Sequence, residues 1–127
     1  MLKMPTKRAM LETARKARQY GYYQHSPYSL GVNCPQCRTE VTASRSAHGE
    51  RSIPKVLDAA MVAHLPACTV MLAVRDGEDV SSAPHEALAD AVDLAPFNSP
   101  LQRTLDTIYR ARLEADDAAA LARLARS

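Results

Sequence analysis

The chain has no tryptophan, one phenylalanine and only three cysteines in 127 residues. A core with so few large aromatic side chains depends on Leu, Val, Ala and Met, and it is thin. With 46% apolar residues, the chain is expected to form one ordinary domain, or one small domain with extensions. A thin core would gain stability from a metal ion that crosslinks distant parts of the chain.

The sequence signatures of several enzyme classes are also missing. There is no glycine-rich phosphate loop, no nucleophile elbow, no His-Glu-x-x-His pair and no deaminase motif before the cysteines. We expect no secretory signal, because no apolar segment follows the first lysines. No run approaches the roughly 18 apolar residues of a membrane span. These absences predict a non-enzymatic, cytoplasmic protein with neither a membrane nor a small-molecule substrate as partner.

The spacing of the cysteines is typical of a structural zinc site. Cys34 and Cys37 are separated by two residues, and after an interval of 26 residues His64 and Cys68 are separated by three. A Cys-x2-Cys turn lets two sulfurs approach one metal, and Pro35 suits the turn because its ring fixes φ. We therefore predict one structural Zn²⁺, with the ligands Cys34, Cys37, His64 and Cys68.

The second pair of ligands is expected at the end of a helix. Apolar residues recur at helical spacing over 53–61, and His64 falls on the same face. Pro66 is expected to end this helix, because the residue before a proline is driven out of the α region. Cys68 would then lie just past the helix end.

Residues that favour strands flank the cysteine turn, at 28–32 and 38–43. The order Cys-x2-Cys, hairpin, helix, His-x3-Cys resembles a variant ββα zinc finger of the Cys2HisCys type. The resemblance covers about a quarter of the chain and implies metal ligation by its four cysteine and histidine positions. Common fingers have about a dozen residues between the second Cys and the His. Here a polar loop over 44–52 lengthens that interval, so the base-reading geometry of such fingers is not carried over.

Other interpretations of these residues remain open. The histidine could pack in a core, and the cysteines could be buried as small apolar residues. A disulfide between Cys34 and Cys37 would leave the third thiol unpaired, and a redox pair would need a βαβ unit that the sequence does not indicate. His48 or His25 could replace His64 as the nitrogen ligand.

Charge is unevenly distributed along the chain, although the net charge is only +2. Residues 1–57 carry ten Lys and Arg against three Glu, a net +7, whereas residues 58–127 carry six against eleven acidic residues, a net −5. A helix predicted over 6–23 gathers basic residues on one side, which either neutralises phosphates or is an ordinary solvated face. The predicted nucleic-acid-binding residues are Lys7, Arg8, Arg15, Lys16, Arg18, Arg38, Arg45, Arg51 and Lys55.

The tyrosines are concentrated beside these charges, with four of the five between residues 20 and 28. Aromatic rings next to basic residues can stack on unpaired bases. We favour local packing against the first helix or the cysteine turn, where the rings fill the place of the missing Phe and Trp.

The C-terminal half is predicted to be mainly helical. Residues 69–74 are an apolar run expected as a strand or a buried extension, and a short helix is predicted over 82–95. Ser99 and Pro100 mark the start of a long helix that could run to Arg126. Its apolar positions form a heptad seam, so this tail either contacts a protein partner or a second copy, or lies back across the finger.

Together these features predict an α+β, mostly helical fold: a small ββα zinc-finger-like centre between a basic N-terminal helix and a long C-terminal helix. The expected segments are a basic helix and linker over 1–27, a zinc-finger-like core over 28–80 and a helical region over 81–127. The predicted function is that of a small zinc-binding regulatory protein that contacts DNA or RNA through its basic N-terminal half. The alternative is a non-enzymatic adaptor or assembly protein, for instance of a mobile element, with purely structural zinc and protein partners.

Overall fold

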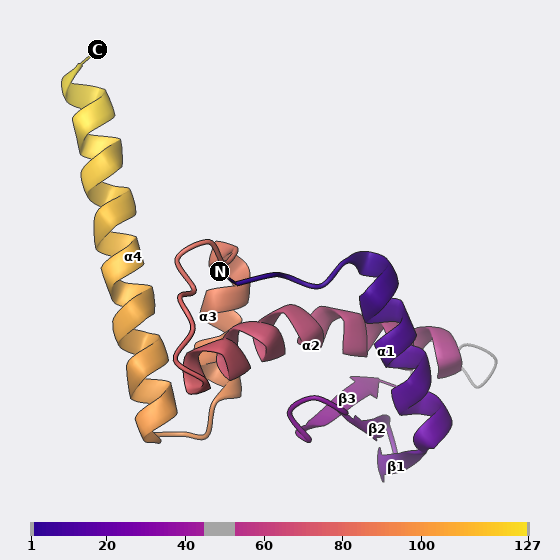
Figure 1. Ribbon diagram of the computed structural model, residues 1–127. Helices are drawn as coiled ribbons and strands as arrows, with labels where there is room; N and C mark the ends of the chain where they lie inside the picture. Colours follow the sequence, from indigo (N-terminus) through magenta and orange to yellow (C-terminus); the bar gives the residue numbers. More distant parts are fainter. Residues whose placement is uncertain (1, 45–52, 127) are drawn as a thin grey trace. The chain divides into compact units, whose positions relative to one another are not determined.

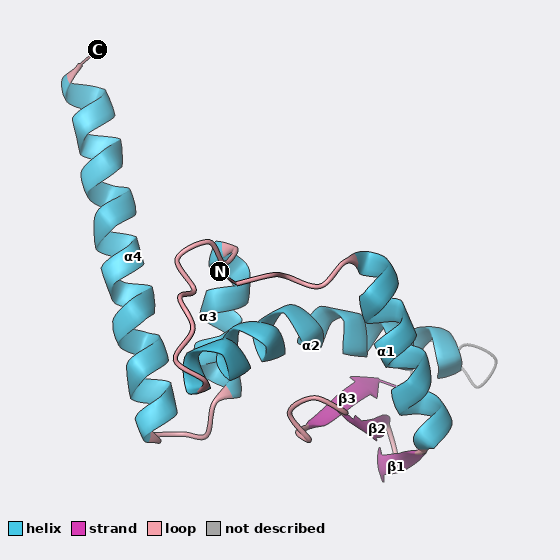
Figure 2. Ribbon diagram, viewed as in Figure 1, coloured by secondary structure: helices cyan, strands magenta, loops and turns pink. Residues whose placement is uncertain are grey.

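A computed structural model describes residues 2–44 and 53–126 (Figure 1). In these residues, helices predominate over one small three-stranded antiparallel sheet, which confirms the predicted α+β, mostly helical class (Figure 2). The elements in chain order are α1 (Lys7–Tyr20), β1 (Tyr22–Ser26), β2 (Ser29–Asn33), β3 (Glu40–Ser44), α2 (Ile53–Arg75), α3 (His85–Leu94) and α4 (Pro100–Ala125).

The chain divides into two compact units, and the division falls within α2. The first unit, Lys3–Thr69, contains α1, the sheet and most of α2. The second unit joins Met1–Leu2 to Val70–Ser127 and contains the last turns of α2 together with α3 and α4. The described basic residues and the cysteines predicted as functional belong to the first unit.

Helix α1 begins at a cap that is visible in the sequence. The Thr6 side chain accepts a hydrogen bond from the backbone N–H of Ala9 at 3.1 Å, which satisfies one of the free donors of the first turn. The helix was predicted to reach residue 23, but it ends at Tyr20 because Gly21 adopts φ 148°, a region that favours glycine. The chain then enters β1, a strand that was not predicted from the sequence.

The sheet has the order β1-β2-β3, so both connections are hairpins. Strands β2 and β3 lie close to the two predicted strand segments and confirm them. Burial alternates along β3, where Val41 and Ala43 are buried and their neighbours exposed. Helix α1 contacts β1 and β2, and its buried residues are Ala14 and Ala17.

Gly31 and Tyr23 form a cross-strand pair in β1 and β2. A Cβ atom at residue 31 would lie 2.7 Å from Cε2 of the Tyr23 ring, which covers the glycine. The Tyr23 hydroxyl donates to Glu40 in β3, and this hydrogen bond is the main reason that the pKa of Tyr23 is raised. The ring is therefore held over Gly31 by a contact with the third strand.

We predict that Gly31→Ala lowers the free energy of unfolding of the first unit by about 1–3 kcal/mol, the usual range for overpacking. Urea denaturation measures this loss. The double variant Gly31→Ala/Tyr23→Ser removes the obstructing ring, so the glycine substitution should cost less in the Tyr23→Ser background than alone. Equal costs in both backgrounds would mean that the ring does not restrict residue 31.

Helix α2 is longer than predicted. It was expected to end at Pro66 and to be followed by a strand over 69–74, but it runs through Pro66 to Arg75. Proline inside a helix costs about 3 kcal/mol. Val70 and Met71, which follow it, are 0% and 6% exposed, and burial of each such side chain contributes about 1.5–3 kcal/mol. Packing of the apolar run therefore outweighs the local preference of the proline.

The extra length also changes the hydropathy of this segment. Among the described residues, α2 alone is long and apolar enough to cross a membrane by length and composition, with a mean hydropathy of 1.7. No such segment was expected from the sequence. Buried residues make up 44% of the window concerned, and a core helix of a soluble protein meets the same criterion.

In the second unit, α3 packs beside α4 (Figure 1). Helix α3 begins at His85, slightly later than predicted, and Leu88 and Ala91 on its buried face are at most 1% exposed. Helix α4 begins as predicted, with Ser99 accepting a hydrogen bond from the Gln102 N–H at 3.1 Å and proline in the first helical position.

Helix α4 is buried only in its first half. Leu105 is fully buried, and the Arg112 guanidinium donates to the backbone carbonyls of Ser81 and Ala83. Beyond Arg112 nearly every described residue is exposed, including Leu121 and Leu124. The predicted heptad seam is therefore used for intramolecular packing as far as Arg112, and its continuation is uncovered within the second unit.

Candidate metal centre

Four side chains from two distant segments of the first unit lie together. Their ligand atoms are three sulfurs and one imidazole nitrogen, and all lie within 4.8 Å of one another. These residues are Cys34, Cys37, His64 and Cys68, the four predicted from the spacing. A group of this composition and size can hold one metal ion.

The distances agree with a tetrahedral ion. Tetrahedral zinc with Zn–S near 2.3 Å and Zn–N near 2.0 Å requires separations of about 3.5–3.8 Å between ligand atoms. The Sγ atoms of Cys34 and Cys68 are 3.9 Å apart, and Cys37 Sγ is 3.2 Å from His64 Nε2. All three cysteines are free thiols, so no disulfide competes for the sulfurs. Shifts of up to about 1 Å would complete the tetrahedron.

The first ligand pair lies on a tight turn between β2 and β3. The Cys34 carbonyl accepts a hydrogen bond from the Arg38 N–H at 2.8 Å, and the Cys34 N–H donates to the Thr39 carbonyl at 2.9 Å. These bonds fold the chain back on itself around Pro35. Arg38 adopts φ 62°, the left-handed region that favours glycine. The two strands thus present both sulfurs from one end of the sheet.

The second ligand pair lies on one face of α2. His64 and Cys68 are four residues apart, and side chains at that spacing lie one above the other on a helix. Cys68 was predicted beyond the helix end, but it lies inside the helix because α2 continues through Pro66. Leu57, Met61 and Leu65 on the buried side of α2 are each 1% exposed and help to fix this face in the unit.

The hydrogen bond between Cys34 and Cys68 shifts the pKa values of the two thiols in opposite directions. Their hydrogen bond is the main cause that lowers the pKa of Cys34, against the opposing effect of burial. The same hydrogen bond, followed by burial, raises the pKa of Cys68. A divalent cation between two sulfurs this close would stabilise both as thiolates.

Gln36, inside the cysteine turn, is a candidate outer partner of the centre. Its Oε1 lies 3.7 Å from Cys68 Sγ. A metal-bound thiolate only accepts hydrogen bonds, so the Gln36 amide would turn its NH₂ group toward the sulfur. This residue was not identified from the sequence, where its place between the two cysteines was the only available signal.

The alternative nitrogen ligands do not join the cluster. His25 lies on β1, where its Nδ1 is 3.0 Å from Glu40 Oε1. His48 lies outside the described residues. Among the histidines that the structure describes, His64 alone brings a ring nitrogen to the three sulfurs.

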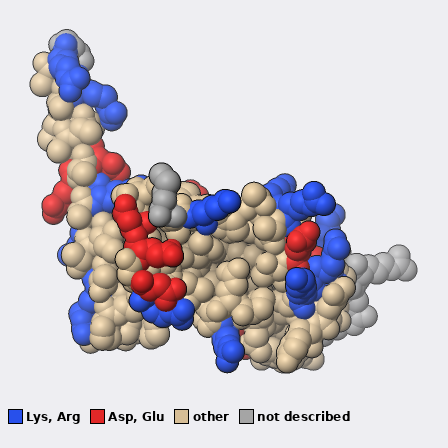
Figure 3. Space-filling view, in the orientation of Figure 1, with Lys and Arg blue, Asp and Glu red and all other residues tan. Residues whose placement is uncertain are grey.

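The predicted nucleic-acid-binding residues have different surroundings. Lys and Arg side chains gather over α1 (Figure 3). Arg18 is an exception on this helix, because it forms a two-point ion pair with Asp58 of α2 at 3.0 and 3.4 Å, with both side chains 24% exposed. The Nε atom of Arg8 lies 4.0 Å from Oε1 of Glu12 on the same helix. The remaining described members of the set are exposed: Lys7, Arg15, Lys16, Arg38 and Lys55. Arg45 and Arg51 lie outside the described residues.

Arg18 therefore joins α1 to α2 instead of facing solvent freely. Its guanidinium presents a planar pair of donors to the Asp58 carboxylate, the geometry in which Arg–carboxylate pairs are strongest. The sequence could not separate this arginine from its neighbours, because its partner lies 40 residues away.

No protein family, curated protein or solved structure matches this chain. A function is therefore assigned from the chemistry of the clustered side chains.

Proposed function

We propose that this chain is a small, non-enzymatic zinc protein in which one Zn²⁺ fastens the cysteine turn to α2. The observation that carries the proposal is the set of three sulfurs and one nitrogen within 4.8 Å. Thiolate and imidazole ligands in tetrahedral arrangement favour Zn²⁺ over Mg²⁺ or Ca²⁺, which prefer oxygen.

The metal is assigned a structural role. Four protein ligands fill the tetrahedral shell of zinc, so no position stays open for water or substrate. Cys34 and Cys68 are at most 1% exposed, which further limits access to the ion. Zinc thiolates also need reduced cysteines, which agrees with the cytoplasmic location expected from the sequence.

The test is the zinc content of protein purified under reducing conditions. We expect one zinc per chain, and we expect His64→Asn to bind zinc at least about tenfold more weakly because it removes one of four ligands. His85→Asn is the matched control, since His85 lies on α3 and contacts Tyr109 instead of the cysteines. Full zinc binding by His64→Asn, or equal loss in both variants, would contradict the assignment.

We propose further that the zinc-bearing unit contacts DNA or RNA through the basic surface of α1, in a regulatory role. Support comes from the exposed Lys7, Arg15 and Lys16 on this helix and from the net +7 charge of residues 1–57. Cations that neutralise phosphates release counterions, so affinity should fall steeply as salt is added. Binding of labelled oligonucleotides, measured between low and moderate salt, tests this.

The second candidate function is that of an adaptor or assembly protein, and one observation favours it. The part of α4 beyond Arg112 exposes Leu113, Leu121 and Leu124 at 37%, 67% and 71%. An uncovered helix with leucines suits contact with a protein partner or a second copy. No nucleic-acid binding at low salt, together with self-association that is lost on truncation after Arg112, would favour this alternative.

A further inference from the structure

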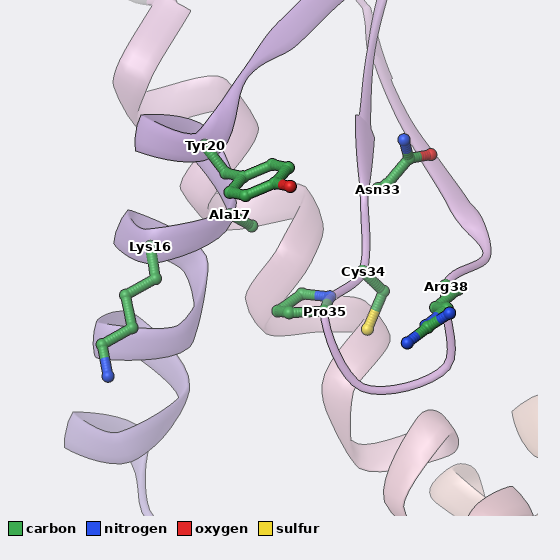
Figure 4. A pocket seen from close by; sticks show the side chains of 7 residues that line it. All are labelled: Lys16, Ala17, Tyr20, Asn33, Cys34, Pro35 and Arg38. Atoms are coloured by element: carbon green, nitrogen blue, oxygen red, sulfur yellow. The ribbon is translucent and has the colours of Figure 1, made fainter.

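A pocket beside the cysteine turn borders the candidate metal centre, because Cys34 is among its lining residues. It has a volume of about 570 Å³, within the range of small-ligand sites in proteins. Helix α1 supplies one wall, with Lys16, Ala17 and Tyr20, and the end of β2 with the cysteine turn supplies the other (Figure 4). The second wall includes Asn33, Cys34, Pro35 and Arg38.

The charge of this pocket is positive and uncompensated. Lys16 and Arg38 line it, and no acidic side chain does. Within the part of the chain that the structure describes, neither cation forms an ion pair, whereas Arg18 on the same helix is paired with Asp58. A zinc centre with three thiolates carries a net charge of about −1, so the two cations still leave the region positive.

The pocket also offers an aromatic ring and an amide. Tyr20 is 98% exposed, and its ring reaches from α1 toward the other wall (Figure 4). Asn33 stands opposite at the end of β2 and can both donate and accept hydrogen bonds. An exposed aromatic ring can stack on the flat face of another ring system. An amide beside it can form hydrogen bonds with polar atoms at the edge of that ring system.

Arg38 occupies a backbone conformation that would suit glycine better. Its φ of 62° costs free energy for a residue with a Cβ atom, and glycine adopts this conformation without strain. The backbone of the turn alone would favour glycine at residue 38, but the residue is an arginine. This arginine is one of the residues that line the pocket.

We propose that this pocket binds one nucleotide unit of a single-stranded nucleic acid. Arg38 holds the phosphate, and Lys16, whose side chain extends along α1 away from the other wall in Figure 4, swings toward it when the strand binds. Tyr20 stacks on the base, and Asn33 contacts the edge of the base. A base inside a duplex is already stacked on both faces, so only an unpaired base can enter the pocket and reach the ring. This inference rests on the proposed nucleic-acid contact. It adds where on the protein the nucleic acid binds, that the bound nucleic acid is single-stranded, and which residues contact it.

The test uses the zinc-loaded full chain with a labelled 12-residue single strand of mixed sequence, the duplex of the same sequence, and free adenosine monophosphate. We expect the single strand to bind at least about tenfold more tightly than the duplex. Lys16→Gln, Tyr20→Leu and Arg38→Gly should each lose about fivefold or more in affinity for the single strand. Lys3→Gln and Tyr28→Leu are the matched controls, because both residues are exposed and neither lines the pocket.

Arg38→Gly separates the ligand contact from the fold. This variant relieves the strained backbone, so its thermal midpoint should equal or exceed that of the wild type while its affinity falls. A lower midpoint with unchanged affinity would assign Arg38 to the fold and overturn the inference.

Each of the remaining outcomes would refute one part of the proposal. Equal affinity for duplex and single strand, or equal losses in the control variants, refutes the pocket but keeps a general basic contact. Binding of adenosine monophosphate as tight as that of the strand assigns the pocket to a free nucleotide and refutes the strand. Absence of all binding at low salt in zinc-loaded protein refutes the nucleic-acid function itself and leaves the zinc assignment standing.

Discussion

Removing the zinc with a strong chelator is expected to unfold the unit Lys3–Thr69 and to leave α3 and α4 folded. Metal binding to a site that exists only in the folded chain contributes on the order of 10 kcal/mol of apparent stability. Whole small domains are stable by only about 5–15 kcal/mol. The unit has no Trp and no Phe, since Phe97 lies outside it. Its apolar core therefore cannot replace a contribution of that size.

Hydrogen exchange followed by mass spectrometry measures this effect separately for each unit, under reducing conditions. Amides in β2, β3 and the first turns of α2 should lose their protection after chelation, and those of α3 serve as an internal reference. Added Zn²⁺ should restore the protection, while added Mg²⁺ should not, because its preferred ligands are oxygens. Unchanged protection of β2 and β3 in zinc-free protein would show that the metal is dispensable for the fold.

The second large effect is expected at Leu57. This side chain is 1% exposed on the buried side of α2, two turns before His64. Replacing a buried leucine by alanine removes apolar contacts and leaves a cavity, at a cost of about 2–5 kcal/mol. We therefore expect Leu57→Ala to lower the free energy of unfolding of the zinc-loaded first unit by that amount in urea denaturation.

Leu11→Ala is the matched control for this prediction. Leu11 is 42% exposed on α1, so the same chemical change should cost well below about 1 kcal/mol. Because folding and zinc binding are linked, Leu57→Ala should also weaken zinc binding, by about tenfold for each 1.4 kcal/mol lost, although Leu57 is not itself a ligand. Similar effects of the two substitutions would mean that α2 does not hold the core of this unit.

Much of the candidate metal centre could be predicted from the sequence, because the residue spacings that define it are local. Two residues between Cys34 and Cys37 specify a turn, and three between His64 and Cys68 place both side chains on one helical face. Helical spacing from residue 53 correctly placed His64 on the core side of α2. The helix N-caps could also be recognised in the sequence. Thr6 and Ser99 occupy the positions where side chains accept hydrogen bonds from the first N–H groups of α1 and α4.

The predictions for the end of α2 and for β1 were wrong because tertiary packing there outweighs the local conformational preference. Pro66 normally ends a helix, and nothing near it in the sequence shows that the apolar run after it will be buried. The strand β1 was missed because the predicted helix was carried past Gly21 to residue 23. The antiparallel pairing of β1 with β2, as of Tyr23 with Gly31, shows the true conformation.

The features that link distant residues could not be predicted at all. Arg18 looks like its basic neighbours until Asp58 is brought beside it. The pocket between α1 and the cysteine turn depends on how the helix packs on β1 and β2, which no local pattern encodes. Arg38 gives no warning in the sequence of its left-handed backbone, because that conformation follows from the hydrogen bond to Cys34.

X-ray absorption spectroscopy at the zinc edge, on protein purified with its metal, is the decisive test of the metal centre. We expect one zinc per chain, surrounded by three sulfurs near 2.3 Å and one imidazole nitrogen near 2.0 Å. The His64→Asn variant should lose the imidazole signal, and His85→Asn should keep it. A shell of oxygen and nitrogen atoms without sulfur, or protein that takes up no zinc while its thiols are reduced, would contradict a zinc centre built from these four residues.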